Sequence, residues 1–280
     1  MAECWKVVIW SLKAAFSGVW PRRDHKGCAW PPGSFEARMA GQPLANGYFL
    51  VLWSLKGDLD YFAKGLFLKH YSCNEFCAFC PAHSDELDVD MLWSNFRKNA
   101  RWKQSAYSVE AWRASLDFLH WLFAEIPYLT HHNVDGDELH LMHLGTTSYM
   151  LGSVLWVLCY DSLAGSPVEN MQAVWAIVKE AYRRDGSDSQ FTNLTLSSFC
   201  DKSSPHSHYP QLKGKGAEIK GLVKPLLLCW HHFESSISHN YAIVLAMLEA
   251  QVRVQEVLTE FAMDLSLPKA VAAELAGPVD

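Results

Sequence analysis

The sequence lacks the excess of positive charge that a dedicated nucleic-acid clamp needs. Its 280 residues hold 24 Lys and Arg against 30 Asp and Glu, which gives a formal net charge of −6 at pH 7. A surface that follows a phosphate backbone is basic, so this composition argues against such a clamp and allows only local basic patches. Charged residues make up 19% and hydrophobic residues 50% of the chain. That balance excludes a disordered protein and predicts a globular one with an ample core.

Signals for export and for membrane insertion are also missing. The apolar run between Lys6 and Lys13 is too short for a signal peptide, and the eight cysteines lack the rhythm of a disulfide scaffold. These absences predict a reducing, intracellular setting. Residues 144–160 carry no charge and reach the lower length limit for a membrane span. Because this stretch contains Thr and Ser and follows polar residues, we expect a buried core helix and no membrane partner.

The most informative stretch of the sequence begins with an apolar run. Tyr48–Leu55 is aromatic, aliphatic and β-branched, which predicts a short strand buried on both faces. Asp58 follows, and apolar residues then recur at helical spacing from residue 59 to residue 66. Asp58 therefore lies at a strand-to-helix junction, where it could be a catalytic acid or simply the N-cap of the helix. Asp60 is the rival acid, since alternation along a continuing strand would place it on the same side.

A cluster of cysteines follows this helix. Cys77 and Cys80 form a C-x-x-C motif, which can be half of a zinc site, a redox pair or two buried thiols. Cys73 and His83 flank the motif, but four ligands within eleven residues leave little room for a tetrahedron. A remote second pair fits better, and His140 and His143 share one face if their segment is helical. We therefore predict a structural zinc ion bound by Cys77, Cys80, His140 and His143, with Cys73 and His83 as alternative ligands and buried thiols as the simpler alternative.

A basic cluster lies further along the chain, in residues 96–103. Its charged residues surround Trp102, a combination that could contact a phosphate backbone and stack on a base. The commoner alternative is a surface loop that buries its tryptophan. The candidate nucleic-acid-binding residues are Arg97, Lys98, Arg101 and Lys103.

The chain divides by pattern into four segments. Residues 1–47 form an N-terminal strand or loop arm, and residues 48–104 hold the strand, the acid, the short helix and the cysteine knuckle. Residues 105–263 form a helical domain, and residues 264–280 form a tail helix. The clearest local signal is Ser166-Pro167-Val168-Glu169, which predicts a helix with a capping box from Ser166 to about Arg184.

The order of these motifs resembles the middle of CACTA-type and related DDE transposases. The matching segments are LWSLKGDLDYFAKGL, CAFCP, DELHLMHLG and, more weakly, YPQLKGKGAEIKGLV, so the resemblance covers about residues 48–235. It implies a mainly helical α/β (α+β) protein with a partial RNase H-like core, a small mixed sheet and a large helical insertion. It also implies that Asp58 is a catalytic acid, that Mg or Mn supports catalysis, that the partner is DNA and that the protein works in the nucleus.

The other two catalytic acids of that family have no convincing counterpart. Asp135 and Asp137 stand beside the histidine motif and could simply order a loop, and the remaining candidates fit by position alone: Asp24, Glu234, Glu249 and Glu256. We therefore expect a fragment or a degenerate copy of a transposase with little or no catalysis. The competing hypothesis is a non-enzymatic, zinc-stabilised helical protein that binds other proteins. Self-association is possible in either case, and no small-molecule substrate is evident.

Overall fold

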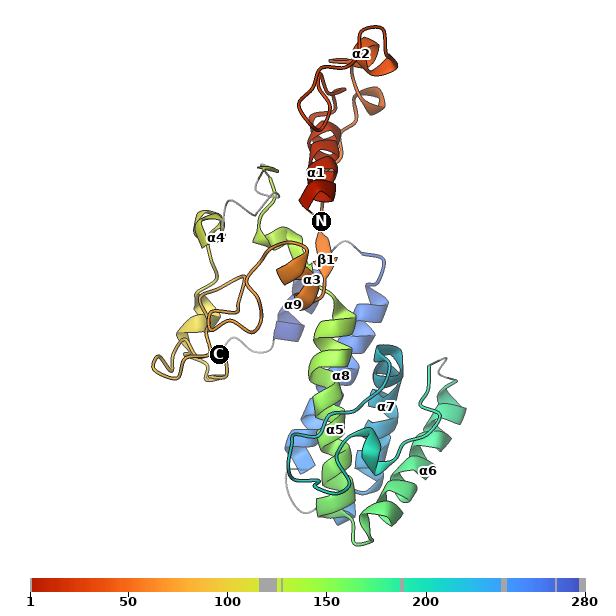
Figure 1. The fold of residues 1–280 in the computed structure, drawn as a ribbon. Helices are drawn as coiled ribbons and strands as arrows, with labels where there is room; N and C mark the ends of the chain where they lie inside the picture. Colours follow the sequence, from red (N-terminus) through yellow and green to blue (C-terminus); the bar gives the residue numbers. More distant parts are fainter. Residues whose placement is uncertain are drawn as a thin grey trace. The chain divides into compact units, whose positions relative to one another are not determined.

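The computed structural model describes residues 2–115, 125–126, 128–186, 189–237, 241–264 and 266–276. The protein is mainly helical, with 54% of its residues in helices and a parallel pair of very short strands. The chain forms two compact units, Met1–Asp137 and Glu138–Asp280, and each is described by itself (Figure 1). This confirms the prediction of a mainly helical protein. The small sheet is a parallel pair and not a mixed sheet.

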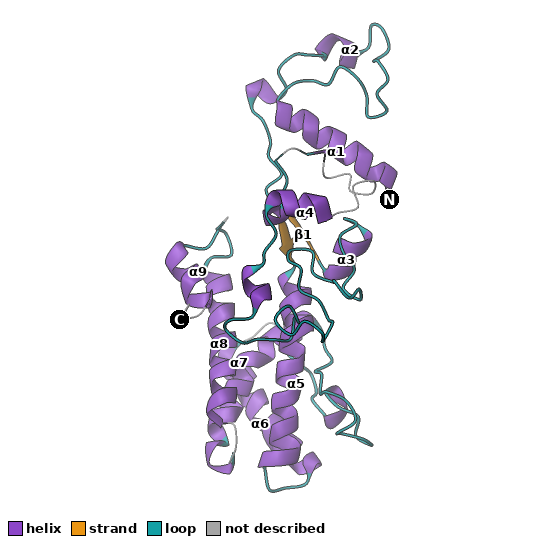
Figure 2. Cartoon of the chain, turned by 90° about the vertical axis from the view of Figure 1, so that its left-hand side faces the viewer, coloured by secondary structure: helices purple, strands orange, loops and turns teal. Residues whose placement is uncertain are grey.

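Apart from the long helix α1, the first unit consists of short elements joined by long loops (Figure 2). Its helices are α1 (Ala2–Ser17), α2 (Phe35–Met39), α3 (Leu59–Lys64) and α4 (Val109–Ser115), with single turns at Ala45–Gly47, Arg101–Gln104 and His131–Asn133. Strand β1 (Leu55–Gly57) pairs in parallel with β2 (Val134–Gly136). The buried core that supports this pair is Ile9, Phe62, Leu66, Leu68, Trp112, Ile126, Leu129 and Val134.

One prediction for this unit is wrong, and another lies partly outside the described residues. Tyr48–Leu55 is not a buried strand, because regular strand pairing begins only at Leu55 and Tyr48, Phe49 and Trp53 are well exposed. A strand buried on both faces needs covering elements on each side, and the described residues do not provide them here. The helix that we predict over residues 109–126 is described as far as Ser115, and residues 116–124 lie outside the described part of the chain.

The second unit is a bundle of long helices. A long helix, kinked at Gly145 (φ −90°, ψ −114°), runs through the π-type segment Leu139–Thr147, α5 (Ser148–Trp156) and a second π-type segment, Val157–Ser162. The others are α6 (Pro167–Asp185), α7 (Gly216–His232), α8 (Tyr241–Glu260) and α9 (Lys269–Ala276). Helix α7 packs against α5, α6 and α8, so it forms the centre of the bundle (Figure 1).

The uncharged stretch of residues 144–160 lies within this bundle. Leu151, Leu155 and Leu158 are fully buried in its core, which agrees with the expected core helix, whereas Tyr149 is exposed. Gly152 lets α5 approach the chain at Leu212, since an added Cβ would lie 2.8 Å from that backbone nitrogen. By length and composition alone, the helix Leu139–Ser162 is also long and apolar enough to cross a membrane.

Candidate functional site

Two acidic residues follow the ends of the paired strands. Gly57 of β1 is in register with Gly136 of β2, and the backbone N–H of Asp137 donates to the Gly57 carbonyl at 2.9 Å. Asp58 and Asp137 are therefore the first residues beyond two aligned, parallel strands. Both are half-buried. The carboxyl edge of parallel strands is the usual place for binding and catalytic groups in sheet proteins, so this edge is the candidate site.

Asp58 also caps helix α3. Its backbone is extended, with φ −80° and ψ 171°, and its Oδ1 accepts a hydrogen bond of 2.6 Å from the N–H of Tyr61. This is the geometry of an N-cap. A carboxylate has about four acceptor positions on its two oxygens, so a cap does not exclude a metal ligand. The catalytic role of Asp58 stays a prediction.

The Tyr61 ring packs on a glycine at each end of α3. It packs so closely on Gly57 that an added Cβ would lie 2.1 Å from Cδ1, and an added Cβ on Gly65 would lie 2.7 Å from Cδ2. Burial raises the pKa of Tyr61 above its usual range. Only glycine fits beneath the ring at position 57. Packing therefore requires this glycine, whether or not the Gly57-Asp58 motif has a function.

The neighbouring acids have other partners. Asp60 forms an ion pair of 2.8 Å with Lys64 on the surface of α3, and this hydrogen bond raises the pKa of Lys64. Asp135 accepts a hydrogen bond of 2.6 Å from the Ser54 hydroxyl. Asp137 is the residue that sequence reasoning undervalued. The repeated pair Gly57-Asp58 and Gly136-Asp137 was the signal that could have found it.

The carboxylates of Asp58 and Asp137 are of the type that Mg and Mn prefer, because both ions take oxygen ligands. Across the described ranges, no three side chains of the His, Cys, Asp and Glu types come together as a metal-binding group. Two carboxylates could hold one divalent cation, whereas the two-metal chemistry of nucleic-acid cleavage needs further ligands.

The cysteine motif is compact. The Sγ atoms of Cys77 and Cys80 lie 3.3 Å apart and both residues are half-buried, while Cys73 is exposed. Burial raises the pKa of the Cys80 thiol to about 11. His83 accepts a hydrogen bond from the N–H of Asp85 through Nδ1 at 3.2 Å. The motif therefore offers two of the four ligands that a structural zinc ion takes.

The two candidate histidine ligands belong to the second unit. His140 is exposed, whereas the His143 side chain is 4% exposed and its Nε2 lies 2.9 Å from Glu138 Oε1. The same carboxylate oxygen lies 3.5 Å from Lys220 Nζ. Because the cysteine pair and the histidine pair lie in different units, the structure describes each pair by itself. The four-ligand zinc site remains a prediction.

The basic cluster of residues 96–103 forms a surface loop. Arg101 makes two hydrogen bonds of 2.7 Å to Asp88, and Lys103 donates to the Phe96 carbonyl at 2.8 Å. Trp102 is half-buried and donates through Nε1 to the Asn95 carbonyl at 2.7 Å. The charges of Arg101 and Lys103 thus help to fold the loop. Arg97 and Lys98 are exposed, and their side chains are the more accessible ones for a phosphate.

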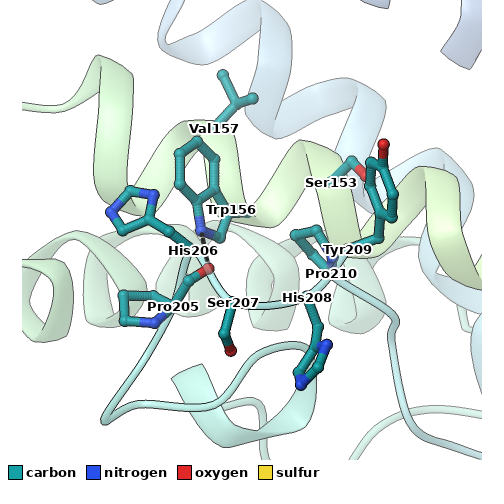
Figure 3. Close-up of a pocket in the computed structure, with 9 residues that line it drawn as sticks. All are labelled: Ser153, Trp156, Val157, Pro205, His206, Ser207, His208, Tyr209 and Pro210. Atoms are coloured by element: carbon teal, nitrogen blue, oxygen red, sulfur yellow. Dashed lines mark hydrogen bonds between the residues drawn. The ribbon is translucent and has the colours of Figure 1, made fainter.

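A cavity of about 540 Å³ lies in the second unit, between α5 and the loop of residues 205–210 (Figure 3). Trp156 forms one wall and donates through Nε1 to the Pro205 carbonyl at 3.0 Å. The ring of His206 meets Trp156 edge-on at 5.2 Å, whereas His208 points away from it (Figure 3). The two histidines do not converge, so the cavity offers no metal site.

Comparison with protein-family models, curated proteins and solved structures finds no match for this chain.

Proposed function

We propose that this chain is a transposase-like protein of a mobile DNA element, and that Asp58 and Asp137 form the remaining carboxylate pair of its metal site. The resemblance of its motifs to CACTA-type and related transposases suggests the class. An RNase H-like core is part of this proposal, with β1 and β2 as two of its strands. The expected partner is DNA and the expected compartment is the nucleus.

The observation that carries the proposal is the alignment of two Gly-Asp junctions. Two residues that are 79 positions apart in the sequence follow adjacent parallel strands, and the Asp137 N–H to Gly57 carbonyl bond joins these strands at that point. A single N-cap would explain Asp58 alone. Asp137 likewise directly precedes a helix, which begins at Glu138, so a second cap is the simpler alternative for it, and the Mn²⁺ measurement below decides between the two.

The chemistry of such a site follows from its ligands. Bound Mg or Mn would activate an attacking oxygen and stabilise a leaving one during phosphoryl transfer. Asp58 and Asp137 would bind the cation and orient it at the strand ends, and Arg97, Lys98, Arg101 and Lys103 would contact the DNA backbone. Because two carboxylates hold fewer metal ions than the full reaction needs, we expect cation binding but little or no strand cleavage.

Binding of Mn²⁺ tests the proposal, measured from the loss of the free-ion signal in electron paramagnetic resonance. We expect about one ion per chain. Asp58→Asn and Asp137→Asn should each weaken binding at least about tenfold, since each removes a charged ligand. Asp60→Asn is the matched control, because Asp60 is a neighbouring acid paired with Lys64. Equal binding by all three variants would exclude the carboxylate pair.

The second candidate function is a zinc-stabilised helical module that binds other proteins. The 3.3 Å approach of the Cys77 and Cys80 sulfur atoms favours it, because thiolates are the preferred ligands of structural zinc. Purified protein should then contain about one zinc ion, and replacing both cysteines by serine should remove it. A folded protein that never takes up zinc would exclude this module.

A further inference from the structure

The segment just before β1 exposes an unusual amount of apolar surface. Tyr48, Phe49 and Trp53 have exposed fractions of 78%, 67% and 63%, and Leu50 and Val51 are exposed between them. The segment forms no regular secondary structure and leads into β1 as a loop (Figure 2). Contiguous apolar patches of this kind are uncommon on monomeric proteins and mark interaction surfaces.

Only some of the backbone N–H groups of this segment form hydrogen bonds. The N–H of Leu50 donates to the Ala15 carbonyl at 3.0 Å, and the N–H of Leu52 donates to the Tyr128 hydroxyl at 3.1 Å. Within the described residues, the N–H groups of Phe49 and Val51 make no hydrogen bond. The segment therefore has backbone N–H groups without a hydrogen bond beside exposed apolar side chains. An unpaired edge strand presents the same groups to another chain.

We propose that residues 48–53 are a self-association surface, and that the occupant is the same segment of a second copy, paired with it as an antiparallel strand. No residue from 48 to 53 carries a charge. Antiparallel pairing with its own copy therefore places apolar side chains opposite apolar side chains, without like charges in register. A two-fold arrangement uses the same patch on both chains and closes as a dimer.

The exposed area supports a dimer. An aromatic side chain can bury about 150–250 Å², so Tyr48, Phe49 and Trp53 together expose on the order of 400 Å². Two copies would bury at most about 800 Å² from these rings, because neighbouring side chains of a strand point to opposite faces. Leu50, Val51 and the paired backbones bring the total towards the ~1,200 Å² at which specific interfaces begin.

Sedimentation equilibrium of the full chain over a wide concentration range tests this inference. We expect the average mass to rise from 31.7 kDa towards twice that value as concentration increases. Phe49→Lys should weaken the dimer at least about tenfold, because it places like charges within a desolvated interface. Val51→Pro should do the same by removing a ladder donor, and this N–H is not needed for an internal hydrogen bond.

Phe96→Lys is the matched control. Phe96 is 69% exposed and meets Trp102 edge-on at 6.3 Å, much as Phe49 is 67% exposed and meets Phe16 edge-on at 6.4 Å. Circular dichroism of each variant establishes that it is folded. A wild-type chain that stays monomeric would overturn the inference, as would a dimer that Phe49→Lys and Phe96→Lys affect equally. Open-ended assemblies in place of dimers would also overturn it, because they contradict the two-fold pairing.

Discussion

Asp58 caps α3 and is also a proposed cation ligand, and two replacements separate these roles. Its Oδ1 caps α3 through the Tyr61 N–H. Asparagine keeps that cap, whereas alanine loses it at a cost of about 1 kcal/mol. We therefore expect Asp58→Ala to lower the free energy of unfolding in urea by about 1 kcal/mol and Asp58→Asn to change it by a few tenths at most. Equal destabilisation by the two variants would show that the carboxylate charge, and not the cap, stabilises the fold.

Single residues also show what sequence reasoning could find at this site. The cap of α3 was predictable, because an Asp before an apolar helical repeat is a local signal. The alignment of Asp58 with Asp137 was not, since it depends on which strand pairs with β1 and in which register. Asp137 is a candidate cation ligand only because the structure aligns Gly57 with Gly136.

Helix α6 is the element that the sequence determines best. Ser166 and Glu169 form the predicted capping box, with the Ser166 N–H donating to Glu169 Oε2 at 2.9 Å, and the helix ends at Gly186 in a left-handed conformation with φ 64°. All of these signals are local. The prediction of a buried strand at Tyr48–Leu55 was wrong, because the burial of a strand depends on elements far away in the chain.

The capping box gives a test at the scale of this element. Ser166→Ala should lower the free energy of unfolding by about 1 kcal/mol, because it leaves a donor of the first turn without its acceptor. Glutamine can replace glutamate in a capping box, so Glu169→Gln serves as the control and should leave the stability nearly unchanged. Thermal unfolding followed by circular dichroism measures both. A Ser166→Ala variant as stable as the wild type would mean that packing alone fixes the start of α6.

Alkaline pH probes the molecule as a whole. Burial raises the pKa of Cys159 and Cys229 from 9.0 to about 12, and that of Tyr182 from 10.0 to about 12. An unfolded chain ionises these groups at their ordinary values while the folded chain keeps them protonated. Their contribution to stability is therefore complete below pH 9 and is lost as the pH rises towards 12.

We expect the free energy of unfolding to fall as the pH is raised above about 9, and to fall less in Cys229→Ala. Urea titrations at pH 8 and at about pH 10.5 provide the comparison. The loss of side-chain volume in Cys229→Ala affects both pH values alike, so only the difference between them counts. A pH-independent stability over this range would show that these groups ionise without unfolding the protein.

Mn²⁺ binding tests the central claim most directly, because the claim is that two aspartates of adjacent strands act on one cation. Electron paramagnetic resonance should show about one bound ion in the wild type and in Asp60→Asn, with binding weakened at least about tenfold in Asp58→Asn and in Asp137→Asn. A chain that binds no Mn²⁺, or that binds it equally well in all four forms, would contradict the claim.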